Sequence, residues 1–154
     1  MDMSHIPPFV QATQEVFAQM FGTQATPEAP RVVDSDDDHE WEISGILGIA
    51  GDAQGIIAIR MPLKATDELL RASGVETTDE QERLATATGL VGEIINIIAG
   101  NAIGMFDGLD LDISPPVVIK GVAHQISWPQ IAPVVAVRFS TAIGPFELGV
   151  CFRR

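Results

Sequence analysis

The chain has 154 residues, of which 46% are hydrophobic and 19% charged, and its formal net charge at pH 7 is −12. This length and composition are typical of folded proteins, so we expect a single domain over residues 1–154 rather than a disordered chain. Nucleic acids and anionic membrane surfaces are bound mainly through lysine and arginine, so the charge disfavours both as partners. It favours a basic protein surface instead.

Cysteine content and hydropathy further limit the kinds of site and the cellular location that we expect. The lone cysteine, Cys151, excludes an intrachain disulfide and a zinc site built from several thiolates. The first residues do not resemble a signal peptide, and no apolar run reaches about 18 residues without a polar interruption. We therefore expect a soluble, cytoplasmic protein without a membrane span.

The first half of the chain predicts one helix followed by extended segments and a β-hairpin. Apolar residues recur at helical spacing up to Phe21, and Gly22 marks the end of that helix. Two isoleucine-rich runs are joined by Gly51-Asp52-Ala53-Gln54, a sequence typical of a hairpin turn. The expected elements are a helix over 9–21, an extended segment over 26–31, an acidic turn over 34–39, and strands over 41–50 and 55–61.

The second half predicts two helices and then three strands. Thr78 as N-cap with Gln81 three residues later fits a capping box at the start of the longer helix. The expected elements are helices over 63–73 and 78–105, a loop over 106–114, and strands over 117–122, 134–141 and 146–152. Strands near both ends and helices between them predict an α+β fold, with a mainly antiparallel sheet packed against a long central helix. Exposed sheet edges favour dimerisation through strands.

The most informative feature is a polar stripe on that long helix. On a helical wheel, six residues fall within about 60° of one line, and most of the remaining surface is apolar. The stripe consists of Gly89, Gly92, Glu93, Asn96, Gly100 and Gly104. Glycine inside a helix costs roughly 0.5–1 kcal/mol relative to alanine. We therefore expect that another molecule approaches the backbone closely along this stripe.

The two polar side chains of the stripe suggest different chemistry. The carboxamide of Asn96 has no useful acid or base group, but it donates and accepts hydrogen bonds, which suits it to orient a water molecule. Glu93 could act as a base, bind a metal or grip a cation. A metal site is disfavoured because no histidine or second carboxylate lies one turn away. The alternative is a solvated helix face without function, although such faces usually carry charged residues rather than glycine.

Other candidate sites are weaker. The acidic stretch 34–40 resembles the start of a calcium loop, but His39 stands where such a loop needs glycine, and Gly45 where it needs a bidentate glutamate. Its expected role is a solvated turn. Cys151 lies in an apolar strand and is expected to be inert core.

Taken together, the motifs resemble the CheX-type members of the CheC/CheX/FliY phosphatases of bacterial chemotaxis, over nearly the whole chain. The matching segments are 8–17, 43–52, 92–102 with its E-x-x-N element followed by IAGNA, 113–119, and the closing strand that contains Cys151. A proline some twenty residues after the asparagine is also typical of the family, and Pro115 or Pro116 can fill that place.

The resemblance implies a function and roles for the stripe. Family members remove the phosphoryl group from the aspartyl-phosphate of the response regulator CheY. Glu93 would pair with a lysine of the regulator, and Asn96 would enter the regulator's active site and orient the attacking water. Gly89, Gly92 and Gly100 would let the partner dock. The Mg²⁺ belongs to the regulator, so this chain is expected to hold no cofactor or metal, and CheX-type members form homodimers.

One position departs from the family pattern. Gly89 stands where members often carry aspartate or serine, so a second polar group is missing from the active face. This departure favours an alternative function, a non-enzymatic dimeric adaptor that binds a receiver domain through the same face. A third alternative is a purely structural dimeric domain.

Overall fold

The computed structural model describes residues 3–33, 40–121, 124 and 126–154. Its strands form an antiparallel sheet in the order β1-β7-β8-β4-β3-β5, with β2 also paired to β7 and β6 also paired to β3. The strands are β1 (Thr26–Pro27), β2 (Arg31–Val33), β3 (Ile43–Gly51), β4 (Gln54–Met61), β5 (Leu111–Ile113), β6 (Val117–Lys120), β7 (Val134–Ser140) and β8 (Phe146–Arg153). The edge next to β3 is therefore built from two short strands.

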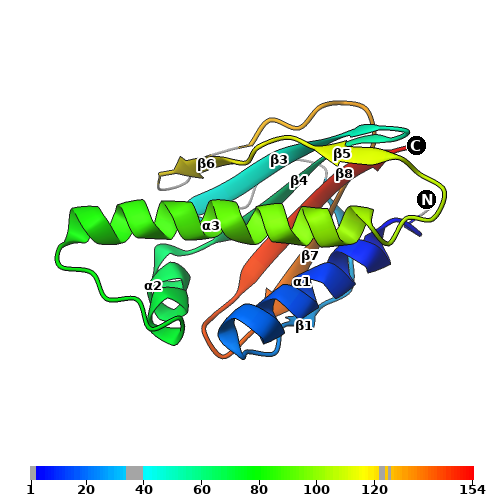
Figure 1. Ribbon diagram of the computed structural model, residues 1–154. Coiled ribbons are helices and arrows are strands. Elements are labelled where there is room, and N and C mark those ends of the chain that lie inside the picture. The colour runs from blue at the N-terminus through cyan, green and yellow to red at the C-terminus, as the bar shows by residue number, and fades with distance from the viewer. Residues whose placement is uncertain (1–2, 34–39, 122–123, 125) are drawn as a thin grey trace.

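Three helices accompany the sheet: α1 (Ile6–Phe21), α2 (Leu63–Ala72) and α3 (Glu80–Ile103). Figure 1 shows α1 and α3 on the same side of the sheet, and α2 beneath the first half of α3. The predicted α+β class, with an antiparallel sheet packed against a long helix, is confirmed.

The hydrophobic core fills the space between the sheet and the helices. Alternate residues of β4, namely Ile57, Ile59 and Met61, are fully buried within it. Aromatic side chains extend the core toward α1, where the ring of Phe17 stacks on that of Phe146 with centroids 4.4 Å apart. The apolar residues of α3 pack on this side of the sheet, whereas Gly89, Glu93 and Gly100 are exposed.

A glycine sets how closely α3 approaches the sheet. A Cβ atom on Gly45 of β3 would lie 2.9 Å from Cγ1 of Val91, 3.1 Å from the carbonyl oxygen of Val91, and 3.2 Å from Cγ2 of Ile95. Carbon atoms pack best at about 3.5–4.0 Å, so α3 could not sit at this depth against a larger residue.

The opposite face of the sheet is covered by the segment before β7. The indole of Trp128 lies directly over Gly149, where an added Cβ would be 2.9 Å from its Cζ2. The thiol of Cys151 is buried and lies 3.4 Å from the carbonyl oxygen of Ala132. Burial raises the pKa of the Cys151 thiol, although that hydrogen bond partly opposes the effect. The predicted place of Cys151 in the core is confirmed.

Several helix ends differ from the sequence prediction: α2 ends at Ala72 rather than at residue 73, and α3 ends at Ile103 rather than at residue 105. Helix α1 begins at Ile6 rather than at residue 9, because prolines are tolerated in the first turn, where amide hydrogens have no partner within the helix. The N-cap of α3 is Asp79, not Thr78: its carboxylate accepts from the amide of Glu82 at 2.7 Å. Thr78 instead donates its hydroxyl and amide hydrogens to the Glu82 carboxylate.

Strand boundaries also needed correction. The predicted loop 106–114 contains β5, which pairs with the end of β3 in the register Ala50↔Asp112. Three residues are too few to show an alternating pattern, so no strand is predicted there from the sequence. Strand β3 begins at Ile43 rather than at residue 41. The predicted acidic turn 34–39 lies outside the described residues.

Helix α3 is long and apolar enough to cross a membrane by length and composition alone. It is also the helix that packs on the sheet, with eight of its residues buried: Ala87, Val91, Gly92, Ile94, Ile95, Ile98, Ala99 and Ala102. Core helices of soluble proteins share this composition, so α3 gives little support for a membrane span. The cytoplasmic location stays a prediction.

The Gly45 contact can be tested by adding one carbon atom. We expect Gly45→Ala to lower the free energy of unfolding by about 1–3 kcal/mol, since overpacking forces the stiff Val91 side chain or the backbone to move. The matched control is Gly48→Ala on the same strand, where the new Cβ would meet Ser114 Oγ at an ordinary 3.6 Å. Urea denaturation of both variants measures the difference, and equal losses would contradict the close approach.

Candidate functional site

Most of the predicted stripe lies on the side of α3 that faces away from the sheet. Glu93, Gly89 and Gly100 are exposed, and Asn96 is half-buried. A Cβ atom on Gly89 or Gly100 would meet no other atom within 4 Å, so the backbone there is open to an approaching molecule. Glu93 and Asn96 therefore lie between two uncovered stretches of helix.

Gly92 is not part of this open surface. It is buried, and an added Cβ would lie 3.4 Å from Cγ2 of Val118 and 3.7 Å from Cγ of Pro116. The expectation that the stripe is open at Gly92 is therefore wrong, and a docked molecule would meet the Pro116–Val118 segment there. The helical wheel could not predict this wall, formed by Pro116 and Val118, because it shows one helix without its neighbours.

The two polar side chains of the stripe have no partner within the described part of the chain. Neither Glu93 nor Asn96 takes part in a hydrogen bond or an ion pair there. Glu82, about three turns before Glu93, behaves differently: bonds from the hydroxyl and the amide of Thr78 lower the pKa of its carboxyl group. The stripe thus presents a carboxylate and a carboxamide whose bonding capacity is left for water or for another molecule.

Glu93 is separated from other charged residues along α3. It is the one charged residue in the sequence from 84 to 106. Arg83, immediately before this interval, pairs with Asp67 of α2 at 3.5 Å. A cationic side chain on a partner would therefore meet Glu93 without competition from a neighbouring arginine on the same helix.

A metal site has no support in the described residues. No group of three or more histidine, cysteine, aspartate or glutamate side chains there could hold an ion. The open stripe contributes a single carboxylate, which is too few ligands for Mg²⁺ or Ca²⁺.

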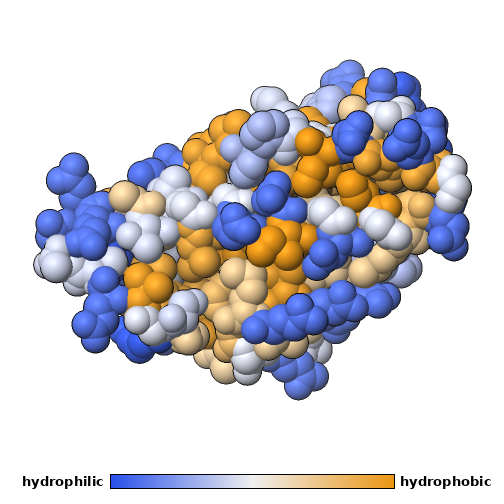
Figure 2. All heavy atoms as spheres, viewed as in Figure 1, coloured by the Kyte–Doolittle hydropathy of each residue, from blue (hydrophilic) through white to orange (hydrophobic). Residues whose placement is uncertain are grey.

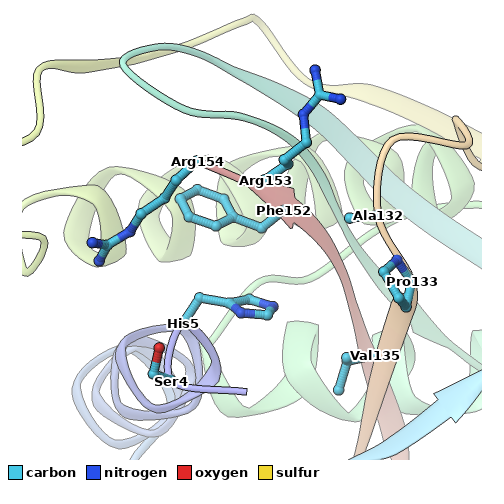
Figure 3. A pocket seen from close by; sticks show the side chains of 8 residues that line it. All are labelled: Ser4, His5, Ala132, Pro133, Val135, Phe152, Arg153 and Arg154. Atoms are coloured by element: carbon cyan, nitrogen blue, oxygen red, sulfur yellow. The ribbon is translucent and has the colours of Figure 1, made fainter. Parts of the chain in front are cut away.

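A cavity of about 260 Å³ lies elsewhere, between the start of α1 and the ends of β7 and β8. Figure 3 shows the ring of His5 pointing into it, whereas the side chains of Arg153 and Arg154 point away. Arg153 donates to the side chain of Gln54 at 3.2 Å, and Arg154 lies over the ring of Phe106. None of the lining residues belongs to α3, so this cavity is separate from the stripe.

The surface around the stripe is mixed. In Figure 2, hydrophilic and hydrophobic side chains alternate along α3, and apolar atoms gather below it between α2 and α1. Leu90 and Ile97 of α3 are only partly buried and contribute to the apolar fraction of this helix surface. A face with an isolated carboxylate and adjoining apolar area suits contact with a protein better than with a small ion.

The family assignment follows from comparison with known proteins. The model of the family "Chemotaxis phosphatase CheX" matches residues 43–140, which is more than half of the chain and includes the whole stripe. The chain belongs to this family. No curated protein sequence matches it.

Solved structures agree with this assignment over the full chain. The chemotaxis protein CheX from Desulfovibrio desulfuricans is 28% identical, with a TM-score of 0.87 over 98% of this chain and 100% of that one. CheX from Vibrio vulnificus is 25% identical, with a TM-score of 0.83 over 97% and 99%. The CheX–CheY–BeF3–Mg²⁺ complex from Borrelia burgdorferi matches with 26% identity and a TM-score of 0.82 over 99% and 100%.

The two exposed glycines, Gly89 and Gly100, should lower the stability of the fold, and this can be measured. Gly89→Ala and Gly100→Ala should each raise the free energy of unfolding by roughly 0.5–1 kcal/mol, because alanine is the better helix former and nothing obstructs its Cβ. Gly92→Ala is the comparison: its Cβ would reach ordinary van der Waals distance from Val118 and Pro116, so this variant should gain at least as much. Urea unfolding gives all three values. Loss of stability in the first two variants would show that these glycines serve the fold rather than an encounter.

Proposed function

We propose that this chain is a phosphatase that hydrolyses the aspartyl-phosphate of a CheY-like response regulator. The observation that carries the proposal is the outward-facing pair Glu93 and Asn96, which has no partner in the described chain and lies between open glycines. Membership of the chemotaxis phosphatase family and the CheY-bound structure of a 26% identical relative support this choice of substrate.

In the proposed reaction Asn96 enters the regulator's active site and its carboxamide orients a water molecule toward phosphorus. The water oxygen forms the new bond to phosphorus while the bond to the aspartyl oxygen breaks. The aspartate leaves as a free carboxylate, and both hydrogens of the water end on the released phosphate. Mg²⁺ bound by the regulator would stabilise charge on the phosphoryl oxygens, as it commonly does in phosphoryl transfer.

Glu93 has a different task in this proposal. Its carboxylate pairs with a lysine of the regulator and so fixes the distance between Asn96 and phosphorus. Positioning contributes more than base strength in such a reaction, because the transition state requires little covalent chemistry from the protein. An acidic protein with an isolated exposed carboxylate at the docking face suits a cationic partner group.

The role of Asn96 predicts a large loss of rate. Asn96→Ala should lower the added rate of receiver dephosphorylation by about 10²–10³-fold, the usual cost of removing one well-placed polar group. The measurement is the decay of a phosphorylated CheY-like receiver with and without the protein, in the presence of Mg²⁺. Asn101→Ala, an exposed position on the same helix, is the matched control and should retain the wild-type rate. An unchanged rate for Asn96→Ala would contradict the mechanism.

Glu93 should affect binding more than chemistry. Glu93→Gln should raise KM for the phosphorylated receiver and leave kcat much closer to the wild-type value, because the amide keeps its size but loses the charge that pairs with lysine. Raising the salt concentration should shift the wild-type KM in the same direction. If kcat fell and KM did not change, Glu93 would belong to the chemical step instead.

The alternative is a non-enzymatic adaptor that holds a receiver domain through the same face. Gly89 favours it, because the position one turn before Glu93 contributes no side chain. Capture of the phosphorylated receiver without faster release of phosphate would support the adaptor. Saturable acceleration of phosphate release would support the phosphatase.

We also propose that the protein is a homodimer. The sheet edge at β6 supports this, because Val117 is a large hydrophobic residue with 61% of its surface exposed. Short edge strands with unpaired backbone groups can join across two copies. Light scattering after size-exclusion chromatography should give a mass of twice 16.5 kDa. A mass of one chain at all concentrations tested would contradict dimerisation.

A further inference from the structure

Two adjacent prolines interrupt the sheet edge that runs beside α3. Strand β3 pairs with β6 up to Ile46 and with β5 from Ile49, so Leu47 and Gly48 have no ladder partner on this side, although both pair with β4 on the other. Proline has no amide hydrogen and cannot donate to a neighbouring strand. Pro115 and Pro116 therefore cannot continue the ladder by themselves.

Ser114 bridges this gap with its side chain. Its amide donates to the carbonyl oxygen of Gly48 at 2.9 Å, and its hydroxyl oxygen accepts from the amide of Gly48 at 2.8 Å. The hydroxyl also donates to the carbonyl oxygen of Pro115 at 3.2 Å. One side chain thus replaces the missing strand contact and fixes the first of the two prolines to β3.

The segment held in this way lies along α3. Figure 1 shows the connection between β5 and β6 running beside the middle of the helix. Pro116 of this segment lies next to Gly92 of the helix: a Cβ on Gly92 would be 3.7 Å from Cγ of Pro116. Asn96 follows Gly92 by four residues and therefore leaves the helix on nearly the same side.

Asn96 needs an external constraint to hold one orientation. It is half-buried, and no hydrogen bond within the described chain fixes its carboxamide. A free side chain of this type samples several rotamers, and each must be given up when it enters a partner's active site. A rigid wall beside it would limit those rotamers before the encounter.

We propose that Ser114 is a positioning residue for Asn96: it anchors Pro115 and Pro116 as a wall that limits the orientations of the carboxamide. This inference rests on the proposed phosphatase function. Ser114 acts through the proline segment and does not touch the phosphoryl group. Removing its hydroxyl should leave docking through Glu93 intact and reduce the fraction of encounters in which Asn96 is correctly aimed.

The kinetic test separates this role from a structural one. Ser114→Ala should lower kcat for dephosphorylation of the receiver by about threefold to tenfold and leave KM unchanged, because only the chemical step uses the aimed carboxamide. Ser114→Thr keeps the hydroxyl and should restore kcat. Ser73→Ala is the matched control, since Ser73 is an exposed serine at the end of α2 that donates to the carbonyl of Leu69. It should behave as wild type.

A second measurement keeps the inference independent of activity. In an NMR spectrum of the free protein, the side-chain amide of Asn96 should be dispersed in the wild type and should move toward averaged positions in Ser114→Ala. Wild-type kcat in Ser114→Ala, a change in KM alone, or an unmoved Asn96 signal would each overturn the role of Ser114. Failure of the wild-type protein to accelerate dephosphorylation would instead reject the phosphatase function. The NMR comparison would still show whether Ser114 restrains the side chain of Asn96.

Discussion

The close contact between α3 and β3 determines which part of the helix is left for other molecules. Because Gly45 has no Cβ atom, Val91 and Ile95 of α3 pack closer to β3 than they could against a larger residue. The opposite side of the helix then carries Glu93 outward with exposed backbone beside it. Rotating α3 by one residue would bury the carboxylate at a cost of several kcal/mol, so the packing of the core also fixes the register of the proposed site.

Much of this could be predicted from the sequence because the signals are local. Helical spacing revealed α1 and α3, hairpin residues revealed the β3–β4 turn, and the isolated polar pair in an apolar helix revealed the face of interest. What could not be predicted depends on contacts between distant segments. The three-residue strand β5 exists because β3 offers it a partner. Gly92 is covered because Pro116 and Val118 pack on it from a different part of the chain.

Because Gly92 is buried, the proposed site is not one continuous open surface. A continuous glycine stripe would suggest a helix laid bare along its length. The structure has two openings, at Gly89 and Gly100, and a wall between them on one side. Asn96 lies at the boundary between wall and opening, whereas Glu93 is exposed. This difference in exposure fits the two proposed roles. The exposed Glu93 can extend toward a docking partner, whereas Asn96 has to hold a fixed orientation to position a water molecule.

The central claim is that this face of α3 enters the active site of a receiver domain. It is tested most directly by NMR titration of the labelled protein with a CheY-like receiver carrying Mg²⁺ and beryllofluoride, a stable mimic of the phosphorylated state. We expect signals from residues 89–100 to shift first and most strongly, with the side-chain amide of Asn96 among them. Shifts confined to other surfaces, such as the Trp128 side of the sheet, would contradict it.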